Sequence, residues 1–199
     1  MRPVGLVILA AGGSRRLGRP KQLVPYRGRS LLRSTAQIAT RSLCRPVVVV
    51  LGAYAAILEG ELYGLPIQVV RNPLWRQGMA TSLRRGLQAL EAGEEETTAV
   101  VVALCDQPLV TVEVINGLVR TYRTEARQIV ASAYAGHLGV PALFDRHFFP
   151  ELMTLEGEEG ARQIIKRHAA DVRDVPFPGG ALDIDTPEDC ERLLVGRGA

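Results

Sequence analysis

The chain alternates between short apolar runs and longer segments in which apolar residues recur at helical spacing. Runs such as 47–51 and 99–104 are apolar at every position. This pattern is typical of parallel strands that are covered by helices on both faces. The predicted strands are 4–10, 46–51, 67–70, 99–104, 129–134, 142–144 and 172–175.

The segments between these strands have the spacing of amphipathic helices. The predicted helices are 30–41, 53–62, 80–92, 112–125, 158–168 and 187–194. Thr111 and Thr186 stand where N-caps belong, and Pro187 suits the first helical position. The alternation predicts an α/β fold, a three-layer α/β/α sandwich with a Rossmann-like, mostly parallel sheet. The stretch 136–149 interrupts the alternation and predicts an antiparallel excursion of that sheet.

Composition predicts one soluble domain over residues 1–199, with 47% hydrophobic and 23% charged residues. Cys44, Cys105 and Cys190 are widely separated and form no C-x-x-C pair. This favours reduced thiols in a cytoplasmic protein over a disulfide framework or a zinc site. No apolar run approaches the length of a membrane span, and the apolar start suits a strand better than a signal peptide.

Positive charge is concentrated in the first part of the chain. The net charge is only +3, yet eight of the 24 basic residues fall within the first 33 positions, a segment without any acidic residue. The cluster indicates either a solvated basic face or an anionic ligand. Aromatic residues make up 5% and do not alternate with the arginines, so a nucleic-acid-binding module is only the third interpretation.

A glycine-rich, cationic loop follows the first predicted strand. Between Ala11 and Lys21 the chain places three glycines, a serine, three arginines and a lysine. Glycine N–H groups can approach a polyphosphate closely while the cations offset its charge. Arg19 stands where a Walker A loop needs lysine, and a dinucleotide fingerprint would need G-x-G-x-x-G. Since the only other lysine is Lys166, Lys21 indicates a site that needs a compact charge.

Aspartates follow the fourth predicted strand and precede the last predicted helix. Asp106 ends the strand, and Asp183 and Asp185 lie before the helix. In open α/β sheets, ligands bind beyond the carboxyl ends of the strands. Each aspartate by itself also suits a turn or a helix start. Opposite the cationic loop, however, Asp106 and one later aspartate would supply the carboxylates that Mg²⁺ takes when it bridges phosphates.

Polar residues also precede the third predicted helix. Asn72, Gly78, Thr81 and Ser82 surround the lone tryptophan, Trp75. Gly78, Thr81 and Ser82 are placed to donate hydrogen bonds to a base or a ribose. Trp75 is interpreted as a packing anchor at the start of the helix.

These elements together resemble a known family. The stretch 9–21 looks like the LAAGxSxRMGxxK signature of nucleotidyltransferases. Within the MobA-like NTP transferase superfamily, three segments resemble the molybdenum cofactor cytidylyltransferase group, often called MocA-like. They are Gly78-Met-x-x-Ser82-Leu, Leu104-Cys-Asp-Gln-Pro108 and Asp183-Ile-Asp-Thr-Pro-Glu-Asp189. Weaker matches are Gly139-x-Pro141-x-Leu-Phe144 and Gly157-x-x-Gly160-Ala-Arg162.

The resemblance implies an enzyme that transfers CMP from CTP to the phosphate of a molybdopterin-type cofactor and releases pyrophosphate. Lys21, Arg16 and Asp106 are the expected catalytic residues, with Lys21 at the α-phosphate. The expected nucleotide-binding residues are Ala10, Ala11, Gly12, Gly13, Ser14, Arg16, Lys21, Asn72, Gly78, Ser82 and Asp106. Asp106 and Asp185 are the expected Mg²⁺ ligands, because the resemblance places the ligand immediately before Thr-Pro.

The acceptor half departs from the family pattern at two positions. Val140 stands where relatives often have histidine or asparagine, and Glu158 replaces the aspartate of a Gly-Asp-x-Gly-Ala-Arg element. The expected acceptor-binding residues are His137, Gly139, Pro141 and Arg162. His137 also suits a solvent-exposed loop.

Other functions of the same site stay open. A related transferase would use GTP on the same cofactor, or CTP on a sugar or alcohol phosphate. A nucleotide-binding chaperone would deliver the cofactor to a molybdoenzyme without releasing pyrophosphate; a molybdoenzyme or its chaperone is the expected protein partner. An acceptor phosphate is already anionic near neutral pH, so transfer needs no strong general base, and the sequence offers no convincing Ser-His-Asp or Cys-His arrangement.

Overall fold

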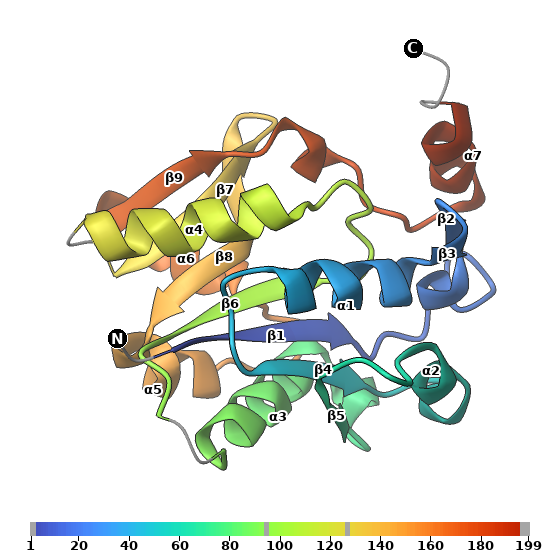
Figure 1. The fold of residues 1–199 in the computed structure, drawn as a ribbon, viewed down its shortest axis with the longest axis horizontal. Coiled ribbons are helices and arrows are strands. Elements are labelled where there is room, and N and C mark those ends of the chain that lie inside the picture. Colours follow the sequence, from blue (N-terminus) through green and yellow to red (C-terminus); the bar gives the residue numbers. More distant parts are fainter. Residues whose placement is uncertain (1–2, 94–95, 126–127, 196–199) are drawn as a thin grey trace.

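A seven-stranded sheet forms the centre of the computed structural model, which describes residues 3–93, 96–125 and 128–195 (Figure 1). The strands are β1 Val4–Ala10, β4 Val47–Leu51, β5 Gln68–Arg71, β6 Ala99–Leu104, β7 Ile129–Tyr134, β8 His137–Asp145 and β9 Val172–Pro176. Their order is β5-β4-β1-β6-β8-β7-β9. Only β8 runs antiparallel to its neighbours β6 and β7. The mostly parallel sheet with an antiparallel excursion is therefore confirmed.

Helices cover both faces of this sheet. They are α1 Leu31–Arg41, α2 Ala55–Glu61, α3 Met79–Glu91, α4 Val112–Thr124, α5 Phe149–Met153, α6 Arg162–Arg167 and α7 Pro187–Val195. Because successive side chains of a strand point to opposite faces, β1 divides its residues between two cores. Leu6 and Ile8 belong to a cluster with α1, α2 and α4, whereas Val7 and Leu9 belong to one with α3, α5 and α6. The three-layer sandwich is confirmed.

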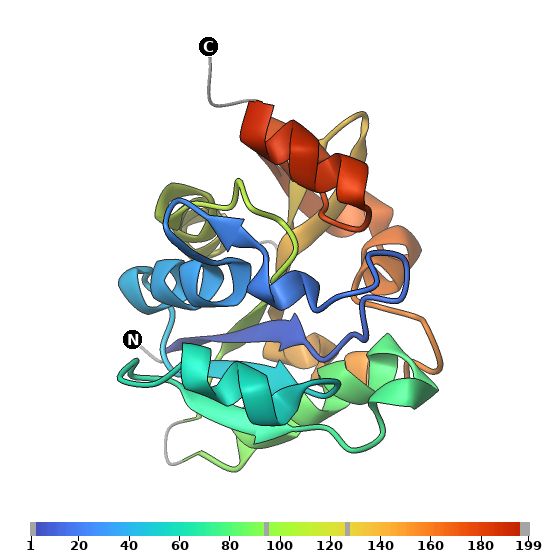
Figure 2. The same ribbon diagram turned by 90° about the vertical axis from the view of Figure 1, so that its right-hand side faces the viewer.

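In a third, smaller hydrophobic cluster, α7 packs against the N-terminal part of the chain. A hairpin of β2 (Pro25–Tyr26) and β3 (Arg29–Ser30) follows the glycine-rich loop. Tyr26 packs in one cluster with Ile184 and Leu193, and Figure 2 shows α7 above the blue N-terminal segment. This packing brings the acidic segment before α7 next to the loop after β1.

Several elements differ from the sequence-based expectation. β8 is longer than predicted, and the hairpin β2–β3 and the short α5 were not predicted. α2 begins only at Ala55 because Tyr54 has a φ of 63°, outside the helical range. α6 begins only at Arg162 because the preceding segment packs on α3, where Ala80 N–H donates to the Gly157 carbonyl at 3.1 Å.

Among the described residues, no helix has both the length and the apolar character that a membrane span requires.

The contact between α3 and the sheet requires a glycine at position 86. A Cβ there would lie 2.4 Å from Cγ1 of Val7. We expect Gly86→Ala to lower the free energy of unfolding by about 1–3 kcal/mol, because the core has no room for the methyl group. Gly60→Ala on α2, where a Cβ meets nothing within 4 Å, is the matched control and is expected to be neutral or slightly stabilising. Urea denaturation measures both, and equal losses would contradict this packing account.

Candidate active site

The carboxyl ends of β1 and β6 border a cavity of about 310 Å³, which is also lined by the loop after β1, the segment from Trp75 to the start of α3, and Glu158. Eight of the expected nucleotide-binding residues line it: Ala10, Ala11, Gly12, Gly13, Lys21, Gly78, Ser82 and Asp106. Ser14, Arg16 and Asn72 are not part of this lining. The position agrees with the rule that ligands of α/β sheets bind beyond the strand ends.

Lys21 joins two carboxylates that come from distant parts of the chain. Its Nζ lies 2.5 Å from Oδ2 of Asp106 and 2.9 Å from Oδ1 of Asp185. Burial by itself lowers the pKa of Lys21, but the charge and hydrogen bond of Asp106, followed by the hydrogen bond of Asp185, outweigh it and raise the pKa above its usual value. The ammonium therefore stays charged between its two partners.

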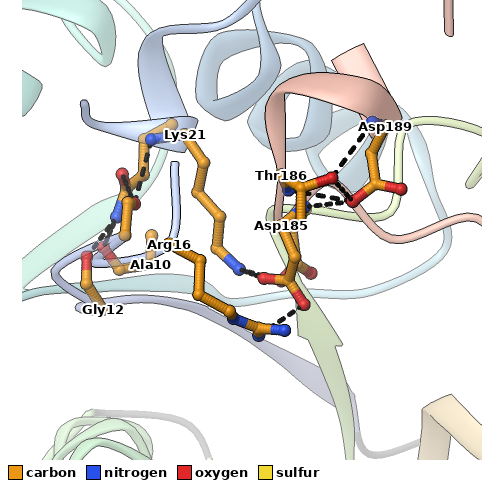
Figure 3. A network of polar contacts seen from close by, with 10 residues as sticks. Ala10, Gly12, Arg16, Lys21, Asp185, Thr186 and Asp189 are labelled. Atoms are coloured by element: carbon orange, nitrogen blue, oxygen red, sulfur yellow. Dashed lines mark hydrogen bonds and ion pairs between the residues drawn. The ribbon is translucent and has the colours of Figure 1, made fainter. Parts of the chain in front are cut away.

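Asp185 is also bound by a second cation. Arg16 Nη2 donates to Oδ2 of Asp185 at 2.7 Å, and the Arg16 side chain is 71% exposed (Figure 3). Among the described residues, Lys21 forms ion pairs with Asp106 and Asp185 but not with Asp183. Desolvation, followed by the negative charges of Asp106 and Asp185, raises the pKa of Asp183 to about 6. The geometry thus groups Asp185, rather than Asp183, with the two cations.

The start of α7 fixes the backbone at Asp185. Oδ2 of Asp189 accepts hydrogen bonds from the backbone N–H of Asp185 at 3.1 Å and of Thr186 at 2.9 Å (Figure 3). In return, Oγ1 of Thr186 accepts from the N–H of Asp189 at 3.3 Å. This reciprocal arrangement is a capping box, and it confirms Thr186 as an N-cap.

The donor set at this site fits a small divalent cation that also binds phosphates. Oδ1 of Asp106 is buried and has no hydrogen-bond partner within the residues that the structure describes. Across the same residues, no group of three or more His, Cys, Asp or Glu side chains gathers as a metal site. Two carboxylates suffice for Mg²⁺ where phosphate oxygens and waters complete its shell. Asp106 and Asp185 are the residues that would hold it.

Asn72 acts on the start of α3 rather than on the cavity itself. Its buried Nδ2 donates to Oγ1 of Thr81 at 2.8 Å and to Oγ of Ser82 at 2.9 Å. Because the hydroxyl of Ser82 accepts this bond, its own O–H remains available as a donor at the cavity wall. Trp75 packs against the loop, since a Cβ on Gly13 would lie 3.0 Å from its ring.

The expected acceptor-binding residues lie outside the 310 Å³ cavity. His137 borders a separate hollow of about 420 Å³ at the turn between β7 and β8. Gly139 of β8 lies against Tyr134, whose hydroxyl would be 2.2 Å from a Cβ at that position. Pro141 follows Val140 in β8, and Arg162 is exposed at the start of α6.

Three residues near these groups were missed by sequence reasoning. Tyr134 Oη and Gln107 Nε2 both donate to the Val140 carbonyl at 3.1 Å. Gln22 is completely buried and donates to the loop after β1. None of the three carries a charge at neutral pH. The available signals were the motif Leu104-Cys-Asp-Gln-Pro108, which contains Gln107, and the position of Gln22 directly after Lys21.

The cysteine that precedes Asp106 is chemically protected. Burial, with a smaller contribution from the Asp106 charge, raises the pKa of Cys105 to about 12, and burial raises that of Cys44 to about 11. Cys190 is buried as well. Because thiolates are the reactive species, we expect a thiol-specific disulfide reagent to label none of the three cysteines in the folded protein and all of them in denaturant. Fast labelling of the folded protein would contradict the described burial.

Comparison with known proteins identifies the family of this chain. Residues 6–172 match a family model described as the MobA-like NTP transferase domain. The chain belongs to this family. As a member, it carries the α/β fold of a nucleotidyltransferase, and the resemblance seen in the sequence is confirmed at this level.

Individual relatives carry different names. The chain is 33% identical to "Nicotine blue oxidoreductase" of Paenarthrobacter nicotinovorans, over 94% of this chain and 95% of the relative. It is 32% identical to a "Probable molybdenum cofactor guanylyltransferase" of Mycobacterium bovis, over 64% of this chain and 61% of the relative.

A solved relative supports the fold over the whole chain. Rv0371c from Mycobacterium tuberculosis H37Rv superimposes with a TM-score of 0.84 at 31% identity, covering 98% of each chain. A second structure of that protein is a complex with manganese, with a TM-score of 0.77 at 30% identity over 97% of this chain and 98% of the relative.

Proposed function

We propose that this protein is a Mg²⁺-dependent cytidylyltransferase, which transfers CMP from CTP to the phosphate of a molybdopterin-type cofactor and releases pyrophosphate. Family membership supports nucleotidyl transfer. The motif resemblance at 9–21 and 78–83 supports CTP and the cofactor. The observation that carries the proposal is Lys21, held between Asp106 and Asp185 beside a cavity that the glycine-rich loop also lines.

The loop and its cations bind the triphosphate in this proposal. The N–H groups of Gly12 and Gly13 donate to the β- and γ-phosphates, and Ser14 holds the loop closed. Arg16 is exposed and offsets the charge of the leaving pyrophosphate. Lys21 moves from the carboxylates to the α-phosphate, where negative charge develops during transfer.

The two carboxylates that Lys21 bridges would hold Mg²⁺, which supplies positive charge to the phosphates when bound. The complex with manganese of the relative Rv0371c is consistent with a divalent cation in this fold. Asp106 offers its unpartnered, buried Oδ1 as well as Oδ2. Asp185 is fixed at the start of α7 by Asp189.

The acceptor needs orientation more than activation. A phosphate monoester has a second pKa of about 6, so it is largely dianionic at neutral pH and attacks without a general base. Catalysis then consists of placing its oxygen in line with the α-phosphorus and stabilising charge. The proposed acceptor-binding residues are His137, Gly139, Pro141 and Arg162. Tyr134 and Gln107 fix the backbone of β8 at Val140, which lies between Gly139 and Pro141.

Pyrophosphate release tests the proposal. Each of the four nucleoside triphosphates is incubated with the protein, Mg²⁺ and either molybdopterin cofactor or a simple sugar or alcohol phosphate. We expect release only with CTP and the cofactor. Release with GTP would assign guanine as the base of the donor. Release with a simple phosphate would assign that phosphate as the acceptor. Nucleotide binding without any release would favour the chaperone alternative and contradict the proposal.

The name of the Paenarthrobacter relative describes a redox reaction and motivates a second assay. The loop after β1 lacks the G-x-G-x-x-G spacing of a dinucleotide fingerprint. We therefore expect the protein not to oxidise NADH or NADPH in the presence of a redox dye. Turnover of a nicotinamide cofactor, without pyrophosphate release from any triphosphate, would favour the redox function instead.

A further inference from the structure

Gln22 is a buried polar residue that the proposed mechanism does not yet use. Its side chain is 0% exposed, although it directly follows Lys21. Nε2 donates to the carbonyl of Ala10 and to that of Gly12, each at 2.9 Å. A glutamine amide carries two N–H donors, so both are used within the protein. Gln22 has no N–H left for a ligand and acts on one only through the loop.

The carbonyls held by Gln22 and by Ala53 determine where the N–H groups of Gly12 and Gly13 point. In a planar trans peptide, the C=O and the N–H lie on opposite sides. Since the Gly12 carbonyl is turned toward Gln22, the N–H of Gly13 is directed away from Gln22. Likewise, Ala53 N–H donates to the Ala11 carbonyl at 3.0 Å and so turns the N–H of Gly12 away from Ala53.

These two amides are free donors at the cavity. Within the described ranges of the chain, neither the N–H of Gly12 nor that of Gly13 has a protein acceptor. Both glycines line the 310 Å³ cavity. Ser14 closes the same unit, because its Oγ accepts from Lys21 N–H at 3.0 Å and lies 3.4 Å from Oε1 of Gln22. One glutamine thus joins the loop to the segment that carries the lysine.

We propose that Gln22 is the positioning residue of this loop. It holds the carbonyl of Gly12 away from the ligand, so that the amide of Gly13 donates to the outer phosphates of a nucleoside triphosphate beside the amide of Gly12, which Ala53 orients. If the peptide unit between Gly12 and Gly13 were flipped, the loop would lose one donor and would place a repulsive carbonyl oxygen beside the phosphate. The inference rests on the proposed function, and it predicts an effect that depends on the number of phosphates.

Nucleotide affinities of a Gln22→Met variant test this dependence. Methionine keeps the length of the side chain and removes both hydrogen bonds, and Gln88→Met at an exposed position of α3 is the matched control. Calorimetry with CTP and with CMP is expected to show a loss of about 10- to 100-fold for CTP, as for one hydrogen bond to a charged group, and no loss for CMP. The control is expected to match the wild type for both nucleotides.

The outcomes are distinguishable. An unchanged ratio of CTP to CMP affinity in Gln22→Met, with or without a common loss, overturns the positioning role, because a general structural effect weakens both nucleotides equally. If the wild-type protein binds CTP no better than CMP, the proposed function falls together with the inference.

A measurement on the wild-type protein does not depend on the folding of a variant. Pyrophosphate is added as the probe while backbone and side-chain amide resonances are followed by NMR. We expect the amide signals of Gly12 and Gly13 to shift strongly and the side-chain amide of Gln22 to keep its position. A large shift of the Gln22 side-chain amide, with unchanged glycine signals, would make Gln22 a direct ligand and overturn the inference.

Discussion

Replacement of Asp106 by asparagine is expected to reduce pyrophosphate release by at least about 100- to 1000-fold, the loss typical of removing one charge-stabilising group. The substitution keeps the shape of the side chain but removes the negative charge that lies 2.5 Å from Lys21. It also removes one of the two carboxylates proposed for the metal, so binding of Mn²⁺, measured by electron paramagnetic resonance, is expected to weaken. Steady-state kinetics with CTP and the cofactor measures the rate.

A matched control separates this effect from a general change of charge. Asp174→Asn makes the same change at an exposed position of β9 and is expected to keep wild-type turnover and Mn²⁺ binding. Both variants are expected to unfold near the wild-type temperature, because Asp106 lies two residues beyond β6, whose core contacts stay intact. Turnover close to wild type in Asp106→Asn would remove Asp106 from the mechanism.

Replacement of Lys21 by methionine is expected to reduce pyrophosphate release by a similar factor, but with the opposite effect on the metal. The ammonium now shares Asp106 and Asp185, so it competes with a cation for the same oxygens. Its removal is expected to strengthen Mn²⁺ binding in the absence of nucleotide and to weaken the binding of CTP. Calorimetry with Mn²⁺ alone and with CTP alone measures the two effects.

The chain provides its own control for this variant. Lys166 is the only other lysine and is exposed on α6, so Lys166→Met is expected to behave as the wild type in all three measurements. A Lys21→Met variant that loses activity with unchanged Mn²⁺ affinity would contradict competition for the carboxylates. One that keeps its activity would contradict the role at the α-phosphate.

Much of the fold could be predicted because the sheet is buried on both faces. Strands such as β4 and β6 consist entirely of apolar residues whose burial requires helices above and below, so these continuous apolar runs predict the layers. The hairpin β2–β3 could not be predicted in this way, since its strands have two residues each and its partner in the core, α7, is distant in sequence. The shortened α6 likewise depends on a tertiary contact of Gly157 with α3.

The candidate site was predictable where a residue type has a specific chemistry. Glycines, a rare lysine and the aspartate that follows β6 identified part of the cavity lining, and the structure brings Lys21 into direct contact with Asp106 and Asp185. The roles of Ser14 and Asn72 depend on neighbours that no pattern reveals, because both side chains bond to other residues that line the cavity. Gln22 was missed for the same reason: its effect lies in two backbone carbonyls rather than in its own chemistry.

Transfer of a labelled α-phosphate distinguishes nucleotidyl transfer from nucleotide binding alone. CTP that carries the label only at its α-phosphate is incubated with the protein, Mg²⁺ and molybdopterin cofactor, and the products are separated. We expect the label to move to the cofactor while unlabelled pyrophosphate appears in equal amount, and we expect Asp106→Asn and Lys21→Met to slow this transfer by at least about 100-fold. Label that remains in CTP, although CTP binds to the cavity, would contradict nucleotidyl transfer by this protein.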